Sequence, residues 1–549
     1  MNRNLASPRF IVGSEYPWNR KVVGDFDIRY AGKIDCWQSI QGVLDNLDPY
    51  SPCISKHVEK ILQKQKSCFG LILISPNECI AMTDQVRSYP IYFSSCQGGV
   101  FVGTNPRSAP FSFDPSNVDA NAIAEYLMCG YVLGEGTLQN SVSCLLAGHT
   151  LWVENTSTAP VTRRYFRYLP TVENTLSVED MTIYFGEVLD KIFKKAIDQL
   201  GDRTVWVPLS GGLDSRLVLC KLVEHKYKNI RAFSYGVHNN HEIRKAKDIA
   251  SHLNVSWHGL PSKLSDLKQL YSANIRQEYA RYADGLHAVP TYLDFEAIYR
   301  LRETKLATEE DVIINGYSGD FLFGGHIPEG LAEKPNLDNL ISHVVDKHCS
   351  HFRGEVANEM ERIVYKSVER SLRSEEIGDE NDKMMCAYYE SWDWQERQSK
   401  AVVNGQRLYE FFELDWLLPL WDKDLVLFWS NVPQAQRIRQ TLHVRYLKNY
   451  NFKGVYDQLR SVNELWTTPW LWVPWIGQLV ECIGGRSRKQ VFYENMFYFG
   501  YFRNQLGMFG YEMYKQYYKN IRRPRVVPLA GLDHLKEIGI NIPFGLRDQ

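Results

Sequence analysis

A glycine-rich turn between an apolar run and a helical pattern is the part of this chain best suited to chemistry. The apolar residues 205–209 lead into residues 210–215, which read Ser-Gly-Gly-Leu-Asp-Ser, and an apolar-periodic segment starts at Leu217. A strand, a tight turn and a helix start aim backbone N–H groups and the positive end of a helix dipole at one point, which suits pyrophosphate. Because no lysine follows Gly212, the turn is not a Walker A loop.

The side chains of this turn have distinct predicted roles. Ser210 and Ser215 can donate hydroxyl hydrogen bonds to phosphate oxygens, whereas Asp214 is better explained as a Mg²⁺ ligand. The alternative is an ordinary helix start, with Asp214 and Ser215 as N-cap residues. These residues resemble the pyrophosphate loop of the ATP-pyrophosphatase superfamily, which implies that ATP is bound by Leu209, Ser210, Gly211, Gly212, Asp214 and Ser215.

A second glycine cluster follows another strand-like run, at residues 312–315. Residues 316–320 read Gly-Tyr-Ser-Gly-Asp, and two more glycines follow at 324 and 325. Asp320 could face Asp214 across a sheet crevice and supply a second oxygen ligand to Mg²⁺ on the phosphates of ATP. Taken alone, such a loop is more often a plain turn from a strand to a helix.

Taken together, the two clusters resemble the synthetase domain of the asparagine synthetase family. That family pairs an S-G-G-x-D-S loop with a later G-[DE]-G-[AS]-D-E-x-F-G-G-Y loop. The resemblance implies that a carboxylate is activated as an acyl-adenylate, with AMP and pyrophosphate released, and that Asp214 and Asp320 hold the metal. The second pattern is kept at Gly316, Asp320, Leu322, Phe323, Gly324 and Gly325.

Three positions depart from the second pattern. Tyr317 occupies the first acidic position, Phe321 replaces the following glutamate, and His326 replaces the final tyrosine. In the family the first acidic residue lies beside the amine and helps to orient or deprotonate it. We therefore count Tyr317 as a catalytic position, and its identity disfavours the formation of asparagine from aspartate.

Further landmarks agree with the resemblance. The strand that carries Ser234 and Tyr235 resembles the one whose backbone contacts adenine, and Gly316 belongs to the same predicted nucleotide site. Residues 418–422 resemble the P-F-L-D element of the family, with Leu417 where an arginine normally stands. Lys448 is the nearest candidate for the lysine that stabilises the acyl-adenylate transition state. The alternative is that Lys448 is only a solvated helix residue.

The first part of the chain is rich in strand-like runs. Residues 84–93 and 125–149 resemble family segments, which implies a glutaminase-like β-sandwich of the N-terminal nucleophile type. Such a glutaminase needs a cysteine as its first residue, whose own α-amine serves as the base. This sequence begins with Met1, and Arg9 or Phe10 aligns with the missing cysteine, while Cys36 and Cys53 are internal. We predict a retained scaffold that does not hydrolyse glutamine.

The order of elements predicts the fold and its division. Short runs at 68–74, 78–82, 90–93 and 99–103 are typical of a β-sandwich. After Pro170, strand and helix patterns alternate, which predicts a doubly wound parallel sheet with ligands beyond the strand carboxyl ends. We predict a glutaminase-like domain over 1–169 and an ATP-pyrophosphatase synthetase domain over 170–549. From residue 382 onward the second domain is predicted to be mostly helical.

The composition excludes several classes of protein. The net charge of −1 gives no electrostatic reason to bind nucleic acid, and eleven cysteines without a C-x-x-C pair favour a reducing compartment. Residues 465–485 are apolar and rich in tryptophan, but proline and glutamate leave no run of ~18 apolar residues. We favour a buried or pocket-lining loop there over a membrane-surface contact aided by residues 486–489. The prediction is a cytoplasmic protein without a membrane span.

The preferred function is ATP-dependent formation of an amide bond, with ATP and Mg²⁺ as cofactors. The acyl substrate is a small molecule, a peptide or a sugar acid. The nitrogen comes from ammonia, which a separate glutaminase could supply, or from an amine on the same substrate. Formation of asparagine is the third variant. The alternative class is a non-catalytic relative that binds nucleotide or a protein partner, and thiolation of RNA is a weak third possibility.

Overall fold

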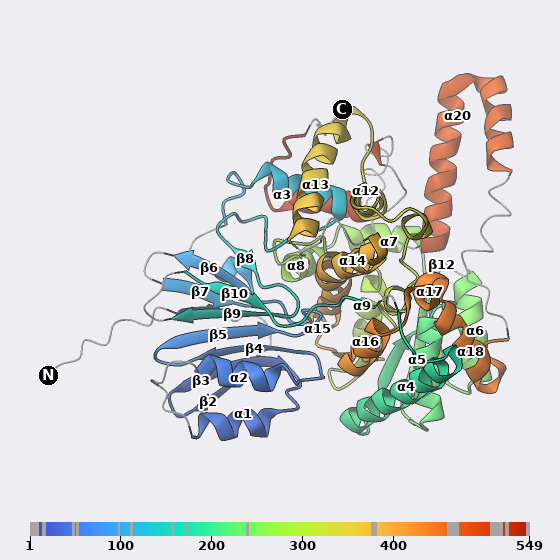
Figure 1. Ribbon diagram of the computed structural model, residues 1–549. Coiled ribbons are helices and arrows are strands. Elements are labelled where there is room, and N and C mark those ends of the chain that lie inside the picture. Colours follow the sequence, from blue (N-terminus) through green and yellow to red (C-terminus); the bar gives the residue numbers. More distant parts are fainter. Residues whose placement is uncertain are drawn as a thin grey trace.

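The computed structural model describes residues 10–13, 18–46, 50, 54–96, 99–109, 113–154, 159–171, 173–237, 241–374, 382–457, 472–505, 520–521 and 526–544. Over these residues a β-rich N-terminal part packs against a larger α/β part (Figure 1). Met1, Arg9, Cys53 and residues 465–471 of the tryptophan-rich segment lie outside the described residues. The rest of that segment is not the predicted buried or pocket-lining loop, because it begins the helix α20 (Val473–Gln505) and its residues Trp472 and Trp475 are exposed. None of the described helices is long and apolar enough to cross a membrane.

Two sheets form the N-terminal part. The smaller has the strand order β1-β7-β6-β8, and the larger has the order β10-β9-β5-β4-β3-β2. β1 pairs in parallel with β7, whereas the other neighbours in both sheets pair antiparallel. The smaller sheet contains β1 (Phe10–Gly13), β6 (Tyr92–Cys96), β7 (Gly99–Gly103) and β8 (Ser143–Cys144). The larger contains β2 (Asn19–Val23), β3 (Phe26–Gly32), β4 (Phe69–Ile74), β5 (Glu78–Thr83), β9 (His149–Glu154) and β10 (Val161–Arg164).

Alternation along the strands explains how these sheets are layered. In β4, Ile72 belongs to a core shared with β6 and β7, whereas Leu71 and Leu73 belong to a core shared with two helices. Successive side chains of a strand point to opposite faces, so both faces of the larger sheet are buried. The helices are α1 (Trp37–Leu44) and α2 (Ile54–Leu62), which lie on its outer face (Figure 1). The two sheets therefore form the predicted sandwich, while its glutaminase-like character stays a prediction.

The α/β part is built on a five-stranded parallel sheet. Its order is β13-β12-β11-β14-β15, and every neighbouring pair is parallel. The chain moves outward in one direction from β11 to β13 and in the other direction from β14 to β15. The crevice between β11 and β14 is thus a topological switch point, where ligands bind beyond the strand ends. The strands are β11 (Val205–Pro208), β12 (Ile230–Val237), β13 (Ser256–Ser262), β14 (Val312–Ile314) and β15 (Asp415–Leu417).

Helices surround this sheet. One long helix begins after Ser177, whose side chain accepts a hydrogen bond from the Asp180 N–H, and Gly201 ends the same helix. A helix of the π type spans Trp394–Val402 (η3). The other main helices are α3 (Ala120–Cys129), α4 (Val178–Leu200), α5 (Asp214–Glu224), α6 (His241–His252), α7 (Leu264–Tyr271), α8 (Asn274–Ala283), α9 (Phe295–Glu303), α10 (Gly319–Leu322), α11 (Glu329–Glu333), α12 (Leu337–His348), α13 (Glu355–Arg373), α14 (Met385–Asp393), α15 (Arg407–Phe411), α16 (Lys423–Ser430), α17 (Gln434–Arg437), α18 (Thr441–Tyr450), α20 (Val473–Gln505) and α22 (Val526–Glu537).

The described residues after 382 are mostly in helices, but they also include the edge strand β15. β15 has three residues and pairs with β14. Three residues are too few to show an alternating pattern, so only the partner strand reveals this element.

Buried polar contacts join the β-rich and the α/β parts. The Lys400 ammonium is fully buried and donates to the Val132 carbonyl at 3.0 Å, to the Gly134 carbonyl at 2.5 Å and to the Glu396 carboxylate at 2.5 Å. Glu396 in turn accepts from the Gly134 N–H at 3.1 Å. Buried charges that are paired in this way resist separation of the two parts. The domain boundary at residue 170 remains a prediction.

Candidate functional site

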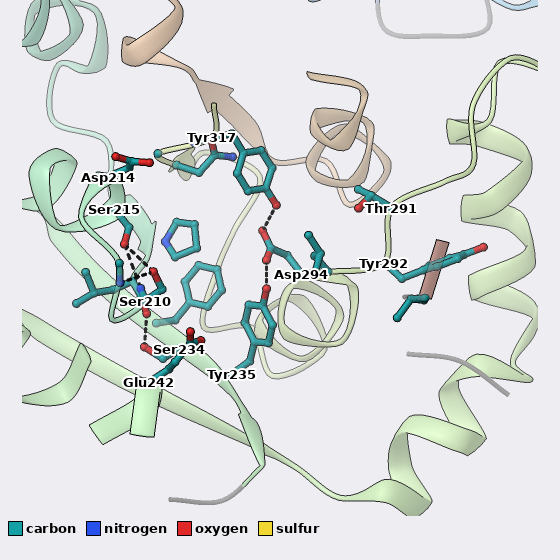
Figure 2. A pocket seen from close by; sticks show the side chains of 18 of the residues that line it. Ser210, Asp214, Ser215, Ser234, Tyr235, Glu242, Thr291, Tyr292, Asp294 and Tyr317 are labelled. Atoms are coloured by element: carbon teal, nitrogen blue, oxygen red, sulfur yellow. Dashed lines mark hydrogen bonds between the residues drawn. The ribbon is translucent and has the colours of Figure 1, made fainter. Parts of the chain in front are cut away.

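A cavity of about 660 Å³ opens at the carboxyl ends of β11, β12 and β14. Figure 2 shows Ser210, Asp214 and Ser215 on one side of it and Thr291 and Tyr292 on the other, with Tyr317, Asp294 and Tyr235 between them. The structure thus brings most of the sequence-predicted residues to one place. Those that line the cavity are Leu209, Ser210, Gly212, Asp214, Ser215, Ser234, Tyr235, Gly316 and Tyr317.

The first loop is held by its own hydroxyl groups. Ser215 Oγ accepts from the Ser210 N–H at 3.2 Å and lies 3.1 Å from Ser210 Oγ, which accepts from the Gly212 N–H at 3.1 Å. Gly211 does not line the cavity, and its carbonyl accepts from the Arg216 guanidinium at 2.9 Å. The loop is therefore shaped before any ligand arrives, and α5 begins at Asp214.

The second loop packs directly against the first. A Cβ added at Gly316 would lie 2.8 Å from the backbone carbon of Asp214, and one added at Gly319 would lie 2.5 Å from the Asp214 carboxylate carbon. Only glycine permits such an approach. The Asp214 carboxylate also accepts a hydrogen bond from the Asp320 N–H. The glycines of the second loop are thus explained by contact with Asp214.

Asp214 and Asp320 are close, but their side chains differ in environment. Burial and the negative charge of Asp320 raise the pKa of Asp214 well above its usual value. Desolvation would raise the pKa of Asp320 as well, but the hydrogen bond and charge of His326 lower it. The Asp320 side chain is 61% exposed and does not line the cavity. Two carboxylates are oxygen donors of the type that Mg²⁺ prefers, so this pair fits the metal chemically.

A buried carboxylate, that of Asp393, contacts the second loop through His326. Asp393 is fully buried and lies 2.8 Å from His326 Nδ1, and it accepts from the Gln398 amide at 3.0 Å. The other ring nitrogen of His326 lies 3.2 Å from Asp320 Oδ2. His326 therefore links the exposed Asp320 to the buried Asp393.

Asp294 is a functional candidate that the sequence reasoning missed. It is 3% exposed, and one of its oxygens accepts from the hydroxyls of Tyr317 at 3.1 Å and Tyr409 at 2.6 Å. The other oxygen accepts from Tyr235 (Figure 2). Three phenol donors on one carboxylate fix a negative charge beside Tyr317. The sequence holds no signal for it beyond an acidic residue before the helix α9.

Positive charge at the cavity comes from an unexpected element. Arg397, on the π-helix η3, is the basic side chain among the described residues that line the cavity. Lys448 does not line it and is exposed on α18. The sequence reasoning missed Arg397 because a single arginine inside a helical pattern has no local signature.

Apolar side chains and one further carboxylate line the rest of the cavity. Glu242 lies in the first turn of α6, and burial raises its pKa. The C-terminal helix α22 contributes Val527 and Ala530, so a segment far along the chain closes the site. Leu293 and Pro290 lie beside Thr291 in the loop before α9.

Comparison with known proteins agrees with this geometry. Residues 187–450 match the family model described as asparagine synthase, which supports an asparagine synthetase-family domain in this part of the chain. The family indicates an ATP-dependent ligase. No curated protein matches the chain. Among solved structures, the chain is similar to the glutamine phosphoribosylpyrophosphate amidotransferase of B. subtilis complexed with ADP and GMP, with 10% identity, a TM-score of 0.18, and coverage of 45% of this chain and 73% of that one.

Proposed function

We propose that this protein is an ATP-dependent carbon–nitrogen ligase that activates a carboxylate as an acyl-adenylate and transfers the acyl group to an amine. The observation that carries this proposal is the contact between the two loops, Ser210 to Ser215 and Gly316 to Asp320, at the switch point of the sheet. A loop of this kind at a helix start suits a pyrophosphate leaving group. The asparagine synthase domain supports the same reaction class.

The proposed nucleotide site follows the geometry of the cavity. ATP would place its phosphates at the Ser210 loop and its adenine beside Ser234, Tyr235 and Gly316, which line the same cavity. Asp214 and Asp320 would hold Mg²⁺, which neutralises phosphate charge when bound. The resulting acyl group would then lie toward Tyr317.

We propose that Tyr317 and Asp294 accept the proton that the amine loses. When the amine attacks the acyl carbon, a C–N bond forms, the bond to the AMP oxygen breaks with its electron pair, and the nitrogen must lose a proton. Because the Tyr317 hydroxyl donates to Asp294, its lone pairs can accept an amine N–H. The amine proton passes to the Tyr317 oxygen while the hydroxyl proton passes to Asp294. General-base transfer of this kind typically contributes about 10²–10⁴-fold.

The proposed nitrogen source is ammonia or an amine of the substrate. Burial raises the pKa of the Cys36 thiol, and burial raises that of Cys79 to about 12. Cys68 is also raised in pKa by burial. A protonated thiol is a poor nucleophile, so these cysteines do not favour glutamine hydrolysis. Ammonia from a separate glutaminase fits the same proposal.

One observation favours a second candidate, a non-catalytic relative that binds nucleotide. None of the described residues that line the cavity is a lysine, because Lys448 lies outside it. The family resemblance assigns stabilisation of the anionic transition state to a lysine, which the described lining lacks although it contains Arg397. This candidate therefore predicts ATP binding without turnover.

Release of pyrophosphate tests both candidates. The wild type would be incubated with Mg·ATP, pooled carboxylic acids and pooled amines including ammonia, with Asp214→Ala as the matched inactive variant. A ligase releases AMP and pyrophosphate only when a carboxylate is present, and Asp214→Ala does not. Binding of ATP without release in any pool supports the non-catalytic relative instead.

A further inference from the structure

The cavity wall has an unusual balance of charge. Three acidic side chains line it, Asp214, Glu242 and Asp294, while Arg397 is the basic one among the described lining residues. A nucleoside triphosphate brings further negative charge into this space. A phosphate ligand at this wall therefore needs the guanidinium of Arg397.

The Arg397 guanidinium still has bonding capacity. Its Nη1 atom is buried and has no hydrogen-bond partner. The nearest carboxylate oxygen, Asp393 Oδ1, is 3.7 Å away, which is an ion pair but too long for a hydrogen bond. A buried N–H without a partner costs free energy unless a ligand accepts from it. One third of the side chain is exposed, at 33%, and Arg397 lines the cavity, so a ligand bound there can contact its side chain.

The surroundings hold this guanidinium in place and keep it charged. Asp393 is fixed by His326 and Gln398, and its charge faces Arg397. Burial alone would lower the pKa of Arg397, but the negative charges of Asp393 and Asp320 raise it. Arg397 lines the same cavity as Ser210 and Asp214 of the first loop and Gly316 of the second. Arg397 lies on a π-helix, a type of helix that is frequent at functional sites.

We propose that Arg397 is a catalytic residue that binds the phosphate oxygens of the nucleotide and stabilises pyrophosphate as it leaves. This inference rests on the proposed ligase function and deepens it. Arg397 would take the part that the resemblance assigns to a lysine further along the chain. A planar guanidinium can donate two parallel hydrogen bonds to a phosphate, which suits a leaving group of this charge.

Direct ligand binding tests this role without knowledge of the acyl substrate. Inorganic pyrophosphate with MgCl₂, and AMP in a separate titration, would be measured by calorimetry with wild type, Arg397→Gln and Arg397→Lys. We expect Arg397→Gln to weaken pyrophosphate binding at least about tenfold, because a charged hydrogen bond is lost. AMP binding is expected to stay, and Arg397→Lys to restore part of the pyrophosphate affinity because it restores the charge. The matched control is Arg373→Gln, since Arg373 is 56% exposed on α13 and does not line the cavity.

The outcomes separate this inference from the function on which it rests. If wild type binds both ligands and Arg397→Gln binds pyrophosphate equally well, the role of Arg397 is wrong while the ligase proposal stands. If wild type binds neither ligand, the ligase proposal fails, and the role of Arg397 fails with it. Circular dichroism and thermal melting confirm that each variant is folded. An equal loss in Arg373→Gln would also overturn a specific role for Arg397.

Discussion

Gly319 lies so close to Asp214 that a Cβ on it would stand 2.5 Å from the Asp214 carboxylate carbon. These two residues are more than a hundred positions apart in the chain, and each follows a strand of the same parallel sheet. Their contact makes one site from two loops. It also explains why the second loop requires glycine at this position.

Replacement of Gly319 by alanine should separate the two loops. The new methyl group collides with the Asp214 carboxylate, and overpacking of this kind costs about 1–3 kcal/mol. We expect weaker Mg·ATP binding by calorimetry and a lower melting temperature. Gly42→Ala is the matched control, because Gly42 lies in α1 with no atom within 4 Å of its added Cβ. Equal ATP affinity in wild type and Gly319→Ala would show that the contact is dispensable.

Tyr317→Phe should block transfer to the amine but not adenylation. It removes the hydroxyl that donates to Asp294 and leaves both phosphate loops intact. With an active substrate pair, exchange of labelled pyrophosphate into ATP should persist, while amide formation falls about 10²–10⁴-fold. The measurement compares the two rates in one preparation.

Tyr409→Phe serves as the control for that experiment. Tyr409 donates to the same oxygen of Asp294 at 2.6 Å but does not line the cavity. Its loss should lower stability by about 1 kcal/mol and affect transfer less than Tyr317→Phe does. If both variants lose transfer equally, the hydrogen bonds only support Asp294, and Tyr317 has no separate part in proton transfer.

His443 should make the fold sensitive to acid. Its ring is fully buried with its centroid 4.0 Å from that of Phe323, and neither ring nitrogen has a hydrogen-bond partner. Burial lowers its pKa to about 3, from an ordinary value of 6.5. Because the unfolded chain takes up the proton more readily, stability is full above pH 6.5 and falls as the pH drops from 6.5 toward 3. The loss is up to about 1.4 kcal/mol per pH unit in that window.

Thermal melting of His443→Leu at several pH values checks this expectation. The variant should gain melting temperature relative to wild type at pH 5, and the gain should shrink as the pH approaches 8. Parallel curves for wild type and variant between pH 5 and 8 would mean that another group causes the acid sensitivity.

Lys400→Met should loosen the junction between the β-rich and α/β parts. It leaves the buried Glu396 without its cation, and removal of one partner of a buried pair costs about 3–5 kcal/mol. A clearly lower melting temperature is expected, with partial recovery in the double variant Lys400→Met, Glu396→Gln. Unchanged melting of Lys400→Met would show that the buried pair does not hold the junction.

The sequence was sufficient for those parts of the site that are continuous in the chain. The loop from Ser210 to Ser215 and the loop at Gly316 are local motifs at strand ends, and both line the cavity as predicted. Asp294 and Arg397 were missed because tertiary packing alone brings them to the cavity. Lys448 was chosen by its distance along the chain, which does not report position in space. The prediction that the tryptophan-rich segment 465–485 is a buried or pocket-lining loop is wrong for its described part, because Trp472 and Trp475 are 68% and 71% exposed at the start of the helix α20. An apolar composition alone does not report whether a segment finds a partner to pack against.

In the two N-terminal sheets, too, some features follow from the sequence and others do not. The strands from β4 to β7 and β9 are recognisable as short apolar runs, whereas the partition of their side chains into two cores depends on which sheet covers which face. A run with both faces buried shows no alternation of polar and apolar residues, so the layering does not follow from the sequence.

Transfer of oxygen from the carboxylate to AMP tests the central claim most directly. A carboxylate that supports turnover would be labelled with ¹⁸O and incubated with the enzyme, Mg·ATP and the amine, and the products would be analysed by mass spectrometry. An acyl-adenylate intermediate predicts one ¹⁸O atom in the phosphate of AMP and none in pyrophosphate. Release of ADP with ¹⁸O in orthophosphate, or of AMP without the label, would contradict the proposed mechanism.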